Sequence, residues 1–312
     1  MLSWLMALTL PSSLSAGIIF SATSCSLGLI DFCKMIYILQ NNVFNFPTID
    51  QQVNEMEILA SVSDIFKEHV NDFSFSLEKY NIYRPSELGL SGDDSNLILF
   101  KGEPATGVNI VFSDESKNCR VFVGEKTTGV GFLISIVASD CIIYIGDRCS
   151  FKKGSIVVCG TGDTVIVGND VTTMPGNQWT TGRHSLVSGK MIVIGDDCMF
   201  ASSVTIRASD GHPVFMPDTG KQINEPRNPI IIEPHCWIGE RAIILKNVNL
   251  GACSIVAAGA VVTKSAPKFS LMAGVPASKK SLNGAVWSRS QREKDKEKSL
   301  MWHQKYGDVN NA

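Results

Sequence analysis

The sequence has little charge and no bias toward either sign. Charged residues make up 19% of its 312 residues, and the formal net charge is -2. The basic residues are dispersed until the C-terminus, so the chain lacks the basic stripe typical of nucleic-acid-binding proteins. With 44% hydrophobic residues the chain can build a large globular core. This composition favours small-molecule or glycan chemistry and predicts no nucleic-acid partner.

Disulfide and zinc-finger patterns are also missing. The nine cysteines are odd in number and include no Cys-x-x-Cys pair. Cys149, Cys198 and Cys236 each come four positions after an aliphatic residue. We interpret them as small packing residues in a reducing compartment, so we expect no disulfide framework and a cytoplasmic location.

The first 39 residues lack the marks of a signal peptide or a membrane span. Their first charge is Asp31 and their one basic residue is Lys34, whereas a secretory signal begins with basic residues. Pro11 and Gly17 interrupt any apolar span of about 20 residues. We favour a packing extension or an over-long start, with Met35 as the true beginning, over membrane association of residues 1–39. Residues 50–73 show the apolar spacing of an amphipathic helix, so residues 1–95 are predicted to form an N-terminal extension.

The sequence does contain a six-residue repeat. The repeated apolar positions are Ile194, Phe200, Ile206, Ile232, Ile238, Ile244, Leu250, Val256 and Val262. A helix of 3.6 residues per turn would spread such positions around its surface, and a plain amphipathic strand would alternate every two residues. A solenoid of short parallel strands satisfies the repeat, because every sixth side chain then points inward and stacks on the one above.

Looser coils precede the regular ones. Strand-like segments end in glycine at Gly124, Gly146 and Gly168, which are 22 residues apart, against 18 for three hexapeptides. We therefore place the solenoid at residues 96–282. Charged residues of both signs fill residues 287–306, which predicts a solvated C-terminal helix within a tail of residues 283–312. The alternative interpretation of that tail is a basic surface that binds phosphate or polysaccharide.

A long loop interrupts the repeat between Arg207 and Ile231. This segment is rich in Pro, Gly, Asp and Asn, and near its start it carries His212, one of five histidines in the chain. Catalytic groups tend to lie on loops held by a rigid scaffold. A neutral histidine can take a proton from a hydroxyl near neutral pH and return it to a leaving group. His212 is therefore our candidate for the catalytic base.

Several motifs together resemble those of a known family. They are Gly211-His212-Pro213-Val214, Cys236-Trp237-Ile238-Gly239, Ile244-Leu245-Lys246, the segment from Ala258 to Lys264, and Ala273-Gly274-Val275-Pro276-Ala277. In order and spacing they resemble the hexapeptide-repeat acyltransferases, which have a left-handed parallel β-helix. The core is similar to galactoside and maltose O-acetyltransferases. The loop and the extra coils are closer to bacterial O-acetyltransferases of capsule, sialic acid and other surface glycans.

The resemblance implies an all-β fold with a long catalytic loop, acetyl-CoA as donor, and no required metal. It also implies a homotrimer with sites between subunits and a carbohydrate acceptor. His212 matches the catalytic histidine and Trp237 the tryptophan of the pantetheine channel. Ala258, Thr263 and Lys264 match contacts to coenzyme A, and Lys279 and Lys280 could offer cations to its 3′-phosphate. Glu240 departs from the small polar residue of simpler sugar acetyltransferases.

On the acceptor side, this chain differs more from the family than it does on the donor side. The family's acceptor asparagine aligns near Arg183 and His184, so we predict acceptor-binding roles for these two and for Asp210; His184 could equally be a second catalytic residue or a structural one. Asp210, Glu233 or a backbone carbonyl could orient the His212 ring. His235 lies at a turn position, where packing or exposure is the favoured interpretation.

The predicted activity is transfer of acetyl from acetyl-CoA to a sugar hydroxyl of a bacterial surface polysaccharide or its precursor. An N-acetyltransferase of a nucleotide sugar is a near alternative. A zinc hydratase of the γ-carbonic anhydrase type has a second histidine five residues after the first, where this chain has Pro217. A non-catalytic solenoid that binds a partner along its faces is the third reading.

Overall fold

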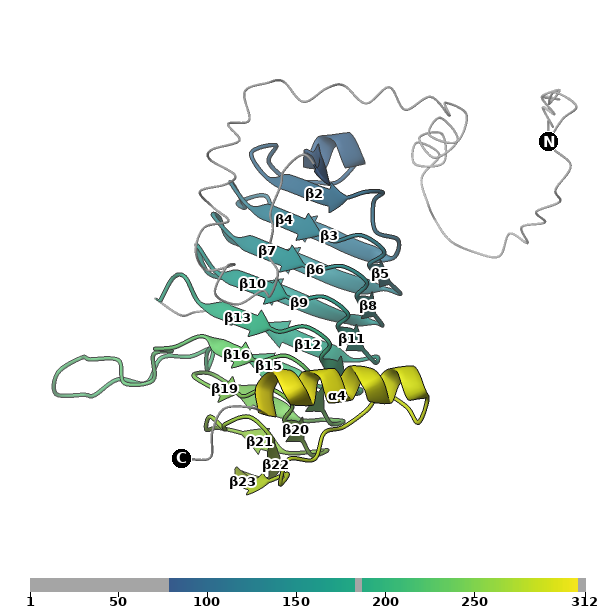
Figure 1. The fold of residues 1–312 in the computed structure, drawn as a ribbon. Coiled ribbons are helices and arrows are strands. Elements are labelled where there is room, and N and C mark those ends of the chain that lie inside the picture. The colour runs from purple at the N-terminus through teal and green to yellow at the C-terminus, as the bar shows by residue number, and fades with distance from the viewer. Residues whose placement is uncertain (1–78, 183–186, 308–312) are drawn as a thin grey trace, which may run out of the picture. The chain divides into compact units, whose positions relative to one another are not determined.

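The computed structural model describes residues 79–182 and 187–307, in which the chain forms a β-solenoid followed by a C-terminal helix (Figure 1). The strands of this part form three sheets. The first contains β1 (Tyr80–Tyr83), β2 (Leu97–Lys101), β4 (Arg120–Val123), β7 (Ile142–Ile145), β10 (Thr164–Val167), β13 (Met191–Ile194), β16 (Ile230–Ile232) and β19 (Asn249–Leu250). A short 3₁₀ helix at Pro85–Leu88 links β1 to β2.

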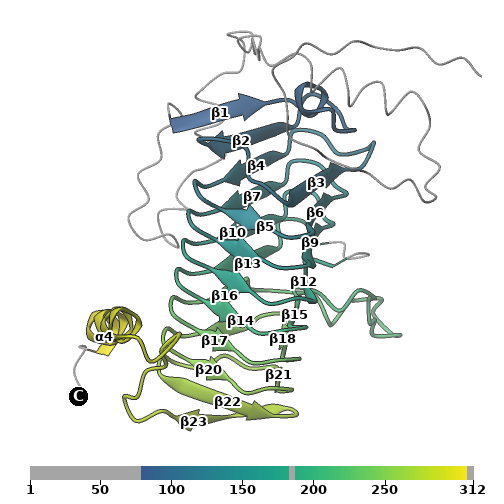
Figure 2. The ribbon, with the colours of Figure 1, turned by 90° about the vertical axis from the view of Figure 1, so that its right-hand side faces the viewer.

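The other two sheets take the remaining strands. The second contains β5 (Thr128–Gly129), β8 (Ser150–Phe151), β11 (Thr172–Thr173), β14 (Met199–Phe200), β17 (Trp237–Ile238), β20 (Ile255–Val256), β22 (Ser270–Gly274) and β23 (Ala277–Ser281). The third contains β3 (Val108–Phe112), β6 (Phe132–Ile136), β9 (Gly154–Val158), β12 (Asn177–Thr180), β15 (Thr205–Arg207), β18 (Ile243–Leu245) and β21 (Val261–Val262). From β4 to β21, successive strands thus pass from the first sheet to the second, then to the third and back to the first (Figure 2).

Strand pairing within each sheet is parallel except at the two ends. There, β1 pairs antiparallel with β2, and β22 with β23. Strands β4, β7 and β10 begin 22 residues apart, whereas β17 and β20 begin 18 apart. The prediction of loose coils leading into regular ones is therefore confirmed. Glycines at the same position of successive coils allow the coils to lie close together, because a side chain on Gly124 would collide with the backbone of Gly146.

The predicted hexapeptide positions line the core. All nine, from Ile194 to Val262, are 0% exposed. In the wider coils above them the core is filled by aromatic rings, with Trp179 packed between Phe151 and Phe200. Burial of stacked apolar side chains is thus the main stabilising term of the solenoid.

The cysteines fill the turns of the coils. The Sγ–H groups of Cys198 and Cys236 are placed to donate to the carbonyl oxygens of Glu233 and Gly251 in the next coil, at 3.3 and 3.4 Å. Burial raises the pKa of the Cys236 thiol well above its ordinary value. Every cysteine in the described ranges is a free thiol. These contacts confirm the packing role predicted for Cys149, Cys198 and Cys236, which are all buried.

The predicted C-terminal helix is present and most of its residues are exposed, but two of them are buried. Helix α4 (Glu293–Gly307) was expected to be solvated, yet its Trp302 and Ser299 are buried against the coils. The charge pattern did not indicate this burial, because one aromatic residue in a polar helix is enough to anchor it.

The predicted helix at 50–73 and the apolar residues 1–39 lie outside the described residues. Within the described ranges, no helix has the length and apolar character needed to cross a membrane.

Candidate active site

The interruption of the repeat is a loop of residues 208–229 between β15 and β16, which we call the His212 loop. Figure 1 shows it extending away from the coils. Its outer part is a hairpin in which Phe215 pairs with Gln222 and the Met216 N–H donates to the Lys221 carbonyl at 2.9 Å. The predicted loop at Arg207–Ile231 is thus confirmed, although it starts one residue later and ends two residues earlier than predicted.

Asn224 closes the base of this hairpin. Its Nδ2 donates to the backbone oxygen of His212 and to Oδ2 of Asp210, both at 2.9 Å. Its Oδ1 accepts from the Val214 N–H at 2.8 Å and from the Gln222 side-chain amide at 3.1 Å. The amide therefore uses both its donor hydrogens and its oxygen, and it fixes the backbone that carries His212.

Lys246 anchors the same network to the coils. Its ammonium group donates to the Asp210 carboxylate and, at 3.0 Å, to the Asn224 carbonyl oxygen. Lys246 follows strand β18, which lies beside β15 in the third sheet. No sequence pattern indicated a role for Asn224, and Lys246 stood out only as part of a motif.

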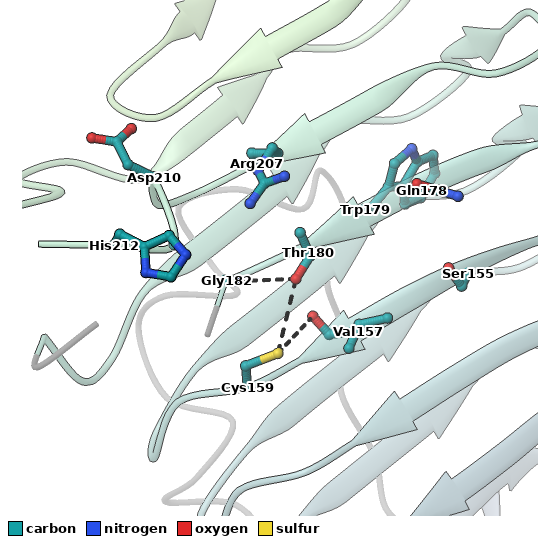
Figure 3. Close-up of a pocket in the computed structure, with 11 residues that line it drawn as sticks. Ser155, Val157, Cys159, Gln178, Trp179, Thr180, Gly182, Arg207, Asp210 and His212 are labelled. Atoms are coloured by element: carbon teal, nitrogen blue, oxygen red, sulfur yellow. Dashed lines mark hydrogen bonds between the residues drawn. The ribbon is translucent and has the colours of Figure 1, made fainter. Parts of the chain in front are cut away.

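A groove of about 490 Å³ runs between this loop and the outer face of the third sheet. The residues that line it come from β9, β12 and β15, from the positions just after β9 and β12, and from the start of the loop: Ser155, Val157, Cys159, Gln178, Trp179, Thr180, Gly182, Arg207, Asp210, Gly211 and His212. Figure 3 shows the His212 ring and the Arg207 guanidinium on the groove, with the Asp210 carboxylate pointing away from both. An exposed histidine thus lies beside hydroxyl and amide groups able to bind a polyol.

No family model matches the chain, but comparison with individual proteins is informative. A polysialic acid O-acetyltransferase of Escherichia coli O1:K1 is 34% identical over 140 residues, which is 45% of this chain and 43% of that protein. The galactoside O-acetyltransferase of Escherichia coli K12 is 35% identical over 100 residues, 32% of this chain and 48% of that protein. The crystal structure of a polySia-specific acetyltransferase is 28% identical with a TM-score of 0.50, covering 68% of this chain and 99% of that one.

Over the matched segments the chain is therefore similar to these acetyltransferases, in agreement with the hexapeptide-repeat acyltransferase family that its motifs resemble. The matched segments span less than half the length of these two curated relatives. Members with different acceptors in their names, polysialic acid and galactosides, both match this chain. This similarity therefore leaves the acceptor to be argued from the groove.

The residues predicted to serve the His212 ring fall in different places. Asp210 lines the groove, but its carboxylate binds Lys246 and Asn224. Glu233 accepts a hydrogen bond from the Ala252 N–H at 2.9 Å and lines a separate pocket with Asn249 and Gly251. Arg183 and His184 lie outside the described residues, and their neighbour Gly182 lines the groove.

The family's coenzyme A positions lie outside the His212 groove of the same chain. Trp237 is in β17 of the second sheet, 38% exposed, with its ring 6.3 Å from that of Trp287. Ala258, Thr263 and Lys264 are exposed around β21, and Lys279 and Lys280 are exposed on β23. None of the six lines the groove that His212 lines.

A second histidine has a quite different environment. His235 is 1% exposed, with Nδ1 2.8 Å from Asp197 Oδ2 and Nε2 3.0 Å from the Trp287 carbonyl oxygen. Its ring stacks on Trp287 with centroids 4.4 Å apart. Both ring nitrogens are engaged by the protein itself, which confirms the packing role predicted for His235.

Asp197 gathers several further donors, and we call this group the Asp197 cluster: Asp197, His235, Trp287, Arg289, Lys298 and Trp302. Its carboxylate accepts from Arg289 Nε and Trp302 Nε1, both at 2.9 Å, and pairs with Lys298 at 3.0 Å. Burial alone would raise the pKa of Asp197, but the hydrogen bond to His235 and the charges of Arg289 and Lys298 lower it to about 2. The cluster therefore holds α4 against the coils.

The described residues bring together no group of three or more His, Cys, Asp or Glu side chains able to hold a metal.

Proposed function

We propose that this chain is an acetyl-CoA-dependent O-acetyltransferase acting on a sugar hydroxyl of a bacterial surface polysaccharide or its precursor. The observation that carries the proposal is an exposed histidine, fixed by the Asn224 network, on a polar groove of a chain similar to these acetyltransferases. The proposal includes a left-handed coil and a homotrimer. The trimer would supply what one chain lacks, because Trp237 and the other coenzyme A positions lie outside the His212 groove.

In the proposed reaction His212 is the general base. It takes the proton of the acceptor hydroxyl as that oxygen attacks the thioester carbonyl carbon, a C–O bond forms, and the C–S bond then breaks. The imidazolium returns the proton to the departing thiolate, so the products are the acetyl ester and free coenzyme A. A backbone N–H near the groove would hold the oxyanion. Thr180, Gln178 and the segment of Arg183 and His184 would contact the acceptor, with Asp210 holding the loop through Lys246.

The donor side would use the family positions. Trp237 would line the pantetheine channel, Ala258 and Thr263 would contact coenzyme A, and Lys264, Lys279 and Lys280 would offer positive charge to its phosphates. The exposure of these residues is compatible with such contacts.

The test is acceptor-dependent thiol release from acetyl-CoA over a panel of sugars, sialic acids and bacterial polysaccharides. We expect His212→Ala to lower the rate about 10²- to 10⁴-fold with acetyl-CoA binding retained. A matched control is His303→Ala, a histidine on α4 outside the groove. Release that survives His212→Ala would remove this residue from the mechanism. Absence of both turnover and coenzyme A binding would favour a non-catalytic solenoid.

A further inference from the structure

Arg207 carries an isolated charge among the strands of the third sheet. Among the described strands of the third sheet, β3, β6, β9, β12, β15, β18 and β21, it carries the only charged side chain. It ends strand β15 and pairs in register with Thr180 of β12 and Leu245 of β18. Arg207 is exposed, so packing in the core does not explain a charged residue at this position.

The guanidinium of Arg207 has no partner in the described ranges. No hydrogen bond or ion pair joins it to residues 79–182 or 187–307, and Figure 3 shows it extending over the groove beside Thr180. The other charged group that lines the groove, Asp210, is paired with Lys246. The charge of Asp210 is thus compensated, whereas that of Arg207 is not.

Arg207 is also close to the catalytic loop. A Cβ placed on Gly211 would lie 3.3 Å from Arg207 Nη2, so the guanidinium packs against the residue that precedes His212. Gly211 has a φ of +85°, a conformation that glycine adopts without strain. Because Gly211 directly precedes His212, an anion bound to Arg207 would lie near the proposed base.

We propose that Arg207 binds the carboxylate of an acidic sugar and so selects an anionic glycan as acceptor. This inference rests on the proposed function and decides between the neutral and acidic acceptors that the family allows. A guanidinium presents two parallel N–H donors that match the two oxygens of a carboxylate. Thr180 and Gln178, which line the same groove, would bind the hydroxyl groups of that sugar.

The experiment compares three acceptors with the full-length protein: polysialic acid, the same polymer with its carboxylates converted to neutral methyl amides, and a neutral galactoside. Arg207→Gln should raise KM for polysialic acid about 10- to 100-fold, with kcat and the KM for acetyl-CoA little changed. For the neutralised polymer, wild type and variant should have the same KM. Arg207→Lys should recover part of the loss, since lysine keeps the charge without the two-pronged geometry.

A matched control is Lys221→Gln, which removes an exposed positive charge from the same loop outside the groove. It should leave all three acceptors unaffected. An equal loss of the acidic and the neutralised polymer in Arg207→Gln would overturn the proposal. So would an unchanged KM for polysialic acid, or a raised KM for acetyl-CoA, which would place a phosphate of the donor on Arg207.

Direct binding separates this inference from the proposed function. Calorimetric titration with polysialic acid in the absence of acetyl-CoA should show binding that Arg207→Gln weakens by the same factor. Arg207-dependent binding without acetyl transfer would support the carboxylate site and refute the transferase. Acetyl transfer to polysialic acid with a KM and a binding affinity that Arg207→Gln leaves unchanged would support the transferase and refute the carboxylate site. Wild-type protein that binds no acidic polymer would also refute the site.

Discussion

His212 and His235 are close in sequence, yet they belong to opposite kinds of environment. His212 is exposed on a loop beside an open groove, whereas His235 is 1% exposed between Asp197 and Trp287. Figure 2 shows α4, which the Asp197 cluster holds, on the side of the coils opposite the His212 loop. Histidine is thus a buried packing residue on one side of the solenoid and an exposed, accessible residue on the other.

The difference lies in how charge is balanced on each side. Asp197 is contacted by Arg289, Lys298, Trp302 and His235, so its charge is satisfied within the protein. On the groove side, no hydrogen bond or ion pair joins the Arg207 guanidinium to the described residues, so we propose an external ligand for it. A saturated cluster contributes to folding, whereas an unsaturated one is available for binding.

The largest expected effect on this comparison comes from Asp197→Ala. Removing one member of a buried ionic cluster leaves the positive groups of Arg289 and Lys298 without their carboxylate, so we expect a loss of about 3–5 kcal/mol in the free energy of unfolding. Chemical denaturation at pH 7 measures it. Well below the melting temperature, kcat should stay within about twofold of wild type, because the groove is on the other side.

The matched control for this change is Asp218→Ala, an exposed aspartate on the His212 loop. It should alter the free energy of unfolding by no more than about 0.5 kcal/mol. An Asp197→Ala protein as stable as this control would show that the cluster does not hold the helix.

A smaller effect should appear in acid. The folded-state pKa of Asp197 is about 2, below its ordinary value of 3.8, so its contribution is complete above pH 4 and is lost as the pH falls toward 2. The shift corresponds to about 2 kcal/mol. Burial raises the pKa of neighbouring Asp196, which acts in the opposite direction. The quantity to measure is therefore the difference between wild type and Asp197→Ala, which should shrink between pH 4 and pH 2.

The smallest effect concerns the groove side. Asn224→Ala removes the hydrogen bonds that fix the backbone of His212, and we expect kcat to fall about 10-fold while KM for both substrates changes little. Steady-state kinetics measures this split. Thr219→Ala, on the exposed tip of the same hairpin, is the control. A variant that changes only the melting temperature would make Asn224 a purely structural residue.

Periodicity in the sequence predicted the coils because their contacts are local and repeated. Ile194, Ile238 and Val256 fall into the core simply by sixfold spacing, and the 22-residue glycine spacing predicted the wider coils. The His212 loop was predicted for the same reason, as a break in that spacing. Each of these features is encoded by residues that are neighbours in the chain or one coil apart.

The remaining contacts could not be predicted because they join distant segments without a periodic signal. Trp302 meets Asp197 across 105 positions, and nothing in a charged helix indicates which of its residues will be buried. Arg207 had been noted only as the start of the loop, because its lack of a partner among the described residues depends on the three-dimensional arrangement of charges. The roles predicted for Arg183 and His184 stay predictions.

The spacing of 22 residues between β4, β7 and β10 has an evolutionary consequence. Because each coil contacts mainly the coils directly above and below it, duplication or deletion of one whole coil would preserve every local contact. The groove depends on β9, β12 and β15, so coils further toward the N-terminus can be gained or lost without disturbing it. The length of the solenoid and the chemistry at its loop can therefore evolve independently.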